Sequence, residues 1–165
     1  MLASLYMAED KVPMTVEGKR LIDEELKHLI SVERPKIVAA IEHARSLGDL
    51  SENADYSAAK ERQGFIEGRI QEINAKIARA QVIDPTSINV DKIVFGATVK
   101  LEEESSGQKI TYQIVGVDEA DIKKNKIGIT SPVARSLIGK KEGDEVEVHA
   151  PKGKVVYSVV EIKYI

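Results

Sequence analysis

Two carboxylates, Asp49 and Glu52, stand three residues apart in a stretch that offers almost nothing to a hydrophobic core. The stretch reads ARSLGDLSENADYSAAKERQ and covers residues 44–63. Carboxylates at a solvent-facing turn can join a hard cation such as Mg²⁺, which keeps several waters and takes one or two carboxylates from a protein. Such a pair could complete a metal site inside another macromolecule.

The same two carboxylates also have a purely structural explanation as helix-capping residues. Asp49 followed three residues later by Glu52 fits a capping box, or Ser51 is the N-cap with Glu52 in the first turn. Carboxylates near a helix N-terminus are stabilised by the helix dipole by roughly 0.3–1 kcal/mol. Spacing alone favours this explanation; the functional one depends on where the pair is placed.

Basic and aromatic side chains flank the acidic pair. Arg45 and Lys60 could contact a phosphate chain that leads to the metal, or they are ordinary solvated helix surface. Tyr56 could stack on a base, but packing between helices is favoured.

The residues before this stretch have a helical period. Thr15 is the expected N-cap, and Pro35 predicts one kinked helix or two abutting helices. Gly48 is expected to end the arm in a left-handed conformation. The apolar stripe is expected at Ile22, Leu26 and Leu29, and then one position out of phase at Ile37, Ala40, Ala44 and Leu47.

The residues after the stretch form a second helical segment with a four–three heptad pattern, which is typical of a coiled-coil seam. Its seam is expected at Ala59, Ile66, Ile70, Ile73, Ile77 and Ala80, with Gln63 breaking the pattern. Two such arms joined by a short loop predict an antiparallel helical hairpin. About 30 residues per arm at ~1.5 Å each give a length of roughly 45 Å.

Beyond Asp84 the period changes to two, which indicates strands. Ser131 and Pro132 predict the start of a short helix within this part. The fold class is therefore α+β, an N-terminal antiparallel coiled-coil hairpin followed by a small antiparallel α+β domain. We expect a disordered extension over residues 1–12, a hairpin over 13–84 with its acidic tip at 48–55, a linker at 85–91 and a domain over 92–165.

Composition excludes several classes of protein. The net charge is −3, with 24 Lys+Arg against 27 Asp+Glu, which argues against a protein that finds free nucleic acid by bulk charge. There is no cysteine, and the histidines have no metal-ligand spacing. No apolar run approaches a membrane span and the start lacks a signal peptide, so we expect a cytoplasmic protein with no membrane partner.

The motif GDLSENADY, with AQVID, VFGATV, SPVARSLIGKKEGDEV and VVEIKYI, resembles the Gre family of bacterial transcript-cleavage factors over residues 14–165. The resemblance implies that the hairpin enters the secondary channel of RNA polymerase. There Asp49 and Glu52 would help hold the second catalytic Mg²⁺ and position the attacking water. The polymerase would then cleave its own backtracked RNA. Arg45 and Lys60 match basic positions that contact this RNA, and the sparse basic face favours the less basic branch of the family.

The resemblance also implies an FKBP-like fold for the C-terminal domain, which anchors the factor on the rim of the channel. Our candidate contact is the SPVARSLIG segment, which could equally be a short helix that closes the sheet. Its candidate docking residues are Ser131, Pro132, Ala134, Arg135, Leu137, Ile138 and Gly139. We expect a monomer with no cofactor and no enzymatic activity of its own, whose only metal is the Mg²⁺ of the polymerase.

The sequence alone leaves three rival functions open. A protein of the same architecture could block the channel as an inhibitor, although the intact acidic pair argues against this. A folding helper would need a prolyl isomerase pocket with a dense aromatic lining, and the domain has only Phe95, Tyr112, Tyr157 and Tyr164. A plain coiled-coil adaptor would leave the tip carboxylates replaceable.

Overall fold

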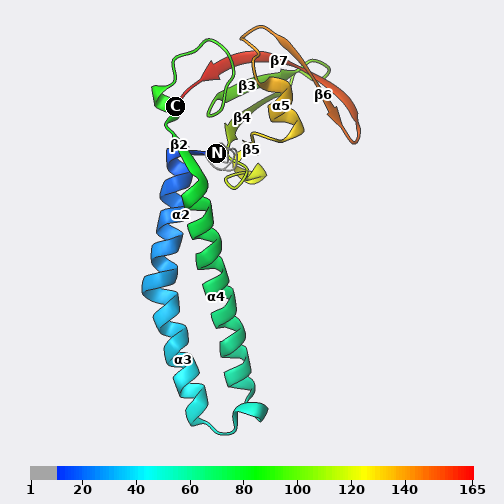
Figure 1. Cartoon of the computed structure of the whole chain (residues 1–165). Helices are drawn as coiled ribbons and strands as arrows, with labels where there is room; N and C mark the ends of the chain where they lie inside the picture. The colour runs from blue at the N-terminus through cyan, green and yellow to red at the C-terminus, as the bar shows by residue number, and fades with distance from the viewer. Residues whose placement is uncertain (1–10) are drawn as a thin grey trace, which may run out of the picture. The chain divides into compact units, whose positions relative to one another are not determined.

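The computed structural model describes residues 11–165, which divide into two compact units of an α+β fold (Figure 1). Residues 19–80 form a helical hairpin, and residues 81–165 form a sheet domain together with the segment that ends at Gly18. Most of the predicted extension lies outside the described residues. Its last residue, Val12, already begins a strand.

The first arm of the hairpin is a helix interrupted by a π-helical turn. α2 (Val16–His28) continues into η1 (Leu29–Glu33), and α3 (Arg34–Ser46) follows with Pro35 in its first turn. The proline cannot donate a hydrogen bond, and just before it the Arg34 N–H bonds to the carbonyl of Leu29, five residues back. The expected change of phase is therefore confirmed, and the wider turn beside the proline accounts for it.

The predicted apolar stripe of this arm is only partly right. Ile37, Ile41 and Ala44 are buried, whereas Ala40 is exposed and Leu47 is 56% exposed. Steps of four and three from Ile37 keep Ile41 and Ala44 on one face of α3, whereas Ala40 and Leu47 lie to the side of that face. The predicted cap of α2 is confirmed, because Thr15 Oγ1 accepts the Gly18 N–H at 3.1 Å.

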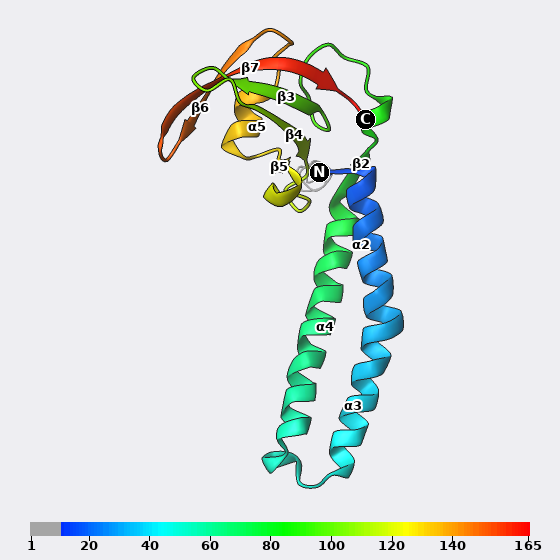
Figure 2. The same cartoon turned by 180° about the vertical axis from the view of Figure 1, so that it is seen from behind.

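The second arm is the uninterrupted helix α4 (Ala54–Arg79), which runs antiparallel to the first arm (Figures 1 and 2). Its 26 residues span about 39 Å at ~1.5 Å each. Ala59, Ile66, Ile70 and Ile73 are buried as predicted, and Ile77 is partly buried.

Two bidentate ion pairs join the arms. Arg69 donates from Nε and Nη2 to Glu25 at 2.6 and 2.8 Å, and Arg34 donates in the same way to Glu67 at 2.7 and 2.9 Å. The hydrogen bonds from each arginine lower the pKa of the glutamate it faces. A fork of two parallel bonds is geometrically specific, so these pairs help to fix the register of the arms.

The sheet domain is built on five strands in the order β5-β4-β3-β7-β6. The strands are β3 (Thr98–Glu103), β4 (Lys109–Val115), β5 (Lys126–Gly128), β6 (Glu145–Ala150) and β7 (Gly153–Lys163). The pairs β3–β4, β3–β7 and β6–β7 are antiparallel as predicted, whereas β4 and β5 are parallel. The register of β3 on β7 shifts between Lys100 and Leu101, and such a bulge increases the local twist of a sheet.

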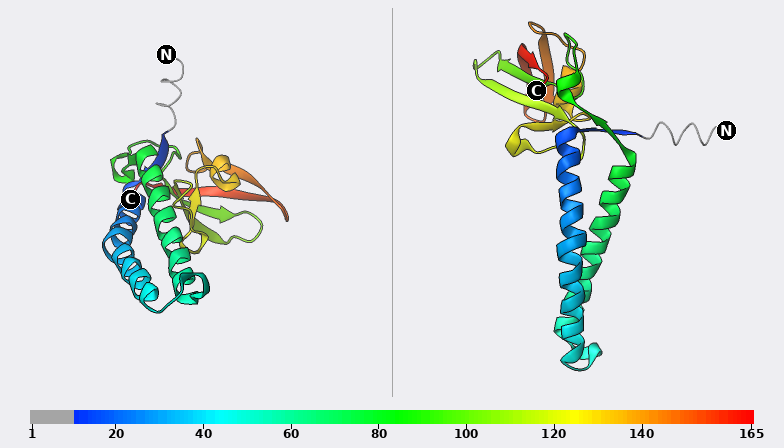
Figure 3. Two further views of the ribbon diagram at one scale, coloured as in Figure 1. Left: turned by 60° about the horizontal axis from the view of Figure 1, so that its bottom comes forward. Right: turned by 90° about the vertical axis from the view of Figure 1, so that its left-hand side faces the viewer.

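The core of this unit lies between the sheet and the short helix α5 (Pro132–Leu137), visible beside the strands in Figure 3. Alternate residues of β3 point into it, with Val99 and Leu101 fully buried. Ala134 and Leu137 of α5 are also fully buried. The predicted cap of this helix is confirmed, because Ser131 Oγ accepts the Ala134 N–H.

The segment expected to be a linker packs onto the sheet domain. It contains the 3₁₀ turn η3 (Pro85–Ser87), and Pro85 is buried. A short two-stranded sheet of β1 (Val12–Thr15) and β2 (Ala80–Ile83) precedes it. Local sequence did not predict these strands, because their pairing joins residues far apart in the chain.

Glu119 fastens β1 to the rest of the sheet domain. Its carboxylate accepts hydrogen bonds from the N–H and the hydroxyl of Thr15 and, at 2.8 Å, from the Gly116 N–H. Gly18 also lies against this carboxylate, where a Cβ would collide with it. The sheet domain therefore extends N-terminally to the first turn of α2.

Candidate functional site: the acidic tip of the hairpin

The turn that joins the arms is short and exposed. After α3 ends at Ser46, Gly48 adopts φ of +140°, in the positive region that favours glycine. Asp49 follows in an extended conformation, and the 3₁₀ turn η2 (Leu50–Glu52) leads to Asn53 and α4. The predicted glycine stop at the end of the first arm is thus confirmed, and both candidate carboxylates lie in the turn.

Asp49 is held in place by its own turn. One carboxylate oxygen, Oδ1, accepts the Ser51 N–H at 3.0 Å and the Ser51 hydroxyl at 2.9 Å. These two bonds, first the backbone one and then the hydroxyl one, lower the pKa of Asp49, so its charged form is favoured. With Oδ1 engaged by Ser51, we find no partner for Oδ2 within residues 11–165.

Glu52 differs from Asp49 in its surroundings. Its backbone N–H donates to the Asp49 carbonyl at 3.4 Å, and its side chain is exposed. Among the hydrogen bonds and ion pairs of the described chain, we find none that engages its carboxylate. The tip (residues 48–55) thus offers one ordered and one adaptable carboxylate.

The predicted capping box is wrong in detail. The Asp49 carboxylate caps η2 through Ser51, two residues on, and neither Asp49 nor Ser51 caps the long helix. That role belongs to Asn53, whose Oδ1 accepts the Tyr56 N–H at 3.0 Å. Asparagine is among the favoured N-cap residues, but so are aspartate and serine, and residue type does not choose between them.

Asn53 also reaches across the turn. Its Nδ2 donates to the carbonyl of Ala44 at 2.6 Å, in the last turn of α3. One side chain therefore bonds to a carbonyl at the end of one arm, which also accepts the Leu47 N–H, and to an N–H at the start of the other. We call this pair of hydrogen bonds the Asn53 bridge.

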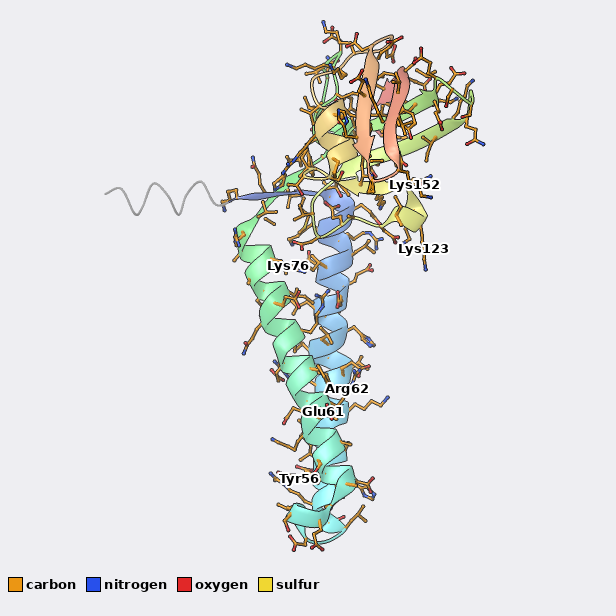
Figure 4. All side chains as sticks on the ribbon, turned by 90° about the vertical axis from the view of Figure 1, so that its right-hand side faces the viewer. Tyr56, Glu61, Arg62, Lys76, Lys123 and Lys152 are labelled. Atoms are coloured by element: carbon orange, nitrogen blue, oxygen red, sulfur yellow. The ribbon has the colours of Figure 1, made fainter. Side chains whose placement is uncertain are left out.

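The predicted basic residues both have partners on the hairpin. Arg45 lies over the ring of Tyr56, with its guanidinium carbon 5.9 Å from the ring centroid, and Lys60 Nζ donates to Gln63 at 3.0 Å. Tyr56, labelled in Figure 4 toward the tip end of α4, is partly buried against the hairpin core as expected. The structure therefore brings Arg45 beside the tip and leaves Lys60 two turns up α4.

The candidate docking segment in the sheet domain has an inner and an outer side. Ala134 and Leu137 are fully buried in the core, so these two side chains cannot touch a partner while the domain is folded. Pro132, Arg135 and Ile138 are exposed. The prediction is therefore wrong for this buried pair, which holds the helix in place, and docking by the other members of the set stays a prediction.

Within residues 11–165 no three acidic, histidine or cysteine side chains cluster as metal ligands would. In the same part of the chain, no helix combines the length and the apolar character needed to cross a membrane.

The fold and the tip define a class of protein, one in which a long helical hairpin presents two acidic side chains and a separate small sheet domain follows. Two family models match almost the whole chain. "Transcription elongation factor, N-terminal" matches residues 12–82, and "Transcription elongation factor, GreA/GreB, C-term" matches residues 88–164. The chain belongs to the GreA/GreB family of transcription elongation factors.

Individual relatives agree with the family match. The chain is 60% identical over 154 residues to the transcription elongation factor GreA of Syntrophotalea carbinolica, and 58% identical over 154 residues to that of Verminephrobacter eiseniae. Each comparison covers 93% of this chain and 98% of the relative. Both relatives are GreA proteins, which agrees with the prediction made from the sparse basic face.

Among solved structures, the GreA factor homolog 1 (Gfh1) protein of Thermus thermophilus is 27% identical, with a TM-score of 0.42. That comparison covers 92% of this chain and 98% of the other.

Proposed function

We propose that this elongation factor inserts the tip of its hairpin into the secondary channel of bacterial RNA polymerase and stimulates the polymerase to cleave its own backtracked RNA. The observation that carries the proposal is the pair Asp49 and Glu52, exposed at the end of an arm about 39 Å long. An arm of this length suits an active site that is buried at the end of a narrow passage. Shortening the RNA from its 3′ end would return an arrested complex to elongation.

The two carboxylates fit a shared metal site. A Mg²⁺ ion wants about six oxygen ligands, and a tip with two carboxylates supplies a minority of them. Asp49 would offer Oδ2, because Oδ1 is engaged by Ser51, while the exposed Glu52 can adjust to the ion or to a water. Bound between the tip and the polymerase, the ion would lower the pKa of an attacking water and stabilise the leaving oxygen.

The remaining residues would hold the RNA and the factor in place. Arg45 and Lys60 would contact phosphates of the extruded RNA, Arg45 with its guanidinium over the Tyr56 ring. The exposed side of the segment from Ser131 to Gly139 would bind the rim of the channel, with Arg135 as its charged member. The factor then acts as a cytoplasmic monomer that activates the enzyme it binds and has no cleavage activity alone.

The test is addition of the purified factor to a stalled, backtracked elongation complex whose RNA carries a 5′ label. The proposal predicts that the labelled RNA shortens in the presence of Mg²⁺ and then extends again when nucleotides are supplied. An unchanged transcript with slowed extension would indicate a channel-blocking inhibitor instead. Isomerase activity on a prolyl peptide would favour the folding-helper alternative.

A further inference from the structure

We propose that Asn53 is a positioning residue for the tip carboxylates, an inference that rests on the proposed function. The Asn53 bridge closes the turn at its base: Nδ2 donates to the Ala44 carbonyl at 2.6 Å, and Oδ1 accepts the Tyr56 N–H at 3.0 Å. The eight residues between Ala44 and Asn53 include both carboxylates. This one amide therefore ties both ends of the turn to each other and to the two arms.

Side-chain packing contributes little to the order of the turn that joins the arms. Its large apolar residues, Leu47 and Leu50, are 56% and 42% exposed. The hydrogen bonds of Asp49 with Ser51 are internal to the turn and fix its local shape, not its attachment to the helices. Apart from the contact of Arg45 with the Tyr56 ring, the attachment comes from Asn53, whose side chain is partly buried and whose two partners lie on different arms.

The chemistry of the amide explains why this residue type is required. An amide presents a donor and an acceptor on one planar group, whereas aspartate supplies acceptors only. Serine carries its single donor on the same short hydroxyl that caps α4, about one bond length short of the position of Nδ2. Aspartate would also point a carboxylate oxygen at the Ala44 carbonyl. Both replacements keep the helix cap and remove the link to the other arm.

A loosened turn would affect the reaction more than binding. If the carboxylates occupy their productive positions for a tenth of the time, the apparent affinity of the tip for the shared ion falls about tenfold. The sheet domain and the hairpin shaft would still bind the polymerase. We therefore expect a loosened turn to lower the cleavage rate at saturating factor, while the factor concentration that gives half of that rate stays nearly unchanged.

The experiment compares Asn53→Ser and Asn53→Asp with the wild-type protein and with Asn74→Ser, the same chemical change at an exposed position of α4. In the full-length factor we expect either Asn53 variant to lower the saturating cleavage rate by about tenfold at fixed Mg²⁺ and to raise the Mg²⁺ midpoint by a similar factor. The half-saturating factor concentration should stay within about twofold, and the Asn74 variant should match wild type.

Backbone relaxation of the free protein supplies a readout that does not depend on cleavage. Order parameters of residues 48–52 should fall from near 0.85 toward 0.6 or below in Asn53→Ser, while those of α4 remain unchanged. Unchanged order parameters, an unchanged saturating rate, or a defect confined to the half-saturating concentration would each overturn the assignment. If wild type itself stimulates no cleavage, the proposed function fails, and the order parameters still decide whether Asn53 fixes the turn.

Discussion

Replacing Ile66 in the hairpin seam should destabilise the hairpin without changing the stability of the sheet domain. Ile66 is 2% exposed and packs with residues of both arms. Truncation to alanine removes three carbons, worth about 2.4 kcal/mol at ~0.8 kcal/mol each, and leaves part of a cavity. We therefore expect a loss of about 3 kcal/mol in the hairpin, and about 1 kcal/mol for the milder Ile66→Val.

Amide hydrogen exchange measures this loss residue by residue. About 3 kcal/mol corresponds to roughly 150-fold faster exchange at ~1.4 kcal/mol per factor of ten, provided the amides of α4 exchange by opening of the hairpin. The sheet domain has its own core, which includes Val99, Leu101 and Ile114, so its strands should keep their protection. The matched control is Val38→Ala on α3, which is 43% exposed and should change stability by less than about 0.5 kcal/mol.

Two results would refute this reasoning. A cost below about 1 kcal/mol for Ile66→Ala would mean that the seam is not the main source of hairpin stability. Equal acceleration in α4 and β3 would mean that the two units unfold together.

Three further predictions concern the ion pairs, the sheet domain and the tip. The Arg69 hydrogen bond lowers the pKa of Glu25 from its ordinary 4.5, so the pair's stabilisation is present above that pH and is lost as the pH falls through the lowered value. Glu25→Gln should cost about 0.5 kcal/mol in thermal melts at pH 7 and almost nothing at pH 2; an equal cost at both pH values would contradict the charge argument. The fragment 90–165 should bind polymerase and compete with the intact factor. It should melt at a lower temperature alone than with a peptide of residues 11–18 added, because without β1 Glu119 loses its hydrogen bonds to Thr15. Equal melting temperatures would contradict the role of Glu119. Finally, Mg²⁺ titration of the isolated factor, followed by the amide signals of residues 49–53, should not saturate below about a millimolar, and tighter binding would mean that the tip is a site in itself.

The period of the apolar residues predicted the hairpin and the α+β class, because both arms bury one face along most of their length. The predicted stripe of α3 is wrong at Ala40 and Leu47, because steps of three and of four residues from Ile37 both fit a helical period, and packing between the arms selects Ile41. The pairing of β1 with β2 and the parallel pair β4–β5 depend on contacts between distant residues. The periodicity of apolar residues along the chain does not indicate which distant segments pair.

At the tip, the sequence identified the two carboxylates but not what holds them. Asp49 and Glu52 were singled out by their place between two long helices and by the resemblance to the Gre family, because spacing alone favoured a helix cap. Asn53 was overlooked because Asp49 and Ser51 are equally acceptable as caps by residue type. The three-dimensional path of the turn separates them, since only Asn53 lies where one amide reaches both arms.

The most direct test of the account is the cleavage rate of a backtracked complex with the double variant Asp49→Asn and Glu52→Gln. Both replacements keep the size of the side chain and remove its charge, and the exposed tip should tolerate them with little loss of folding stability. We expect the saturating rate to fall by about 100-fold or more, since a charged metal ligand contributes several kcal/mol to such a reaction. Competition against labelled wild-type factor should show unchanged affinity for the polymerase. Full stimulation of cleavage by the double variant would contradict the central claim that the tip carboxylates complete the active site.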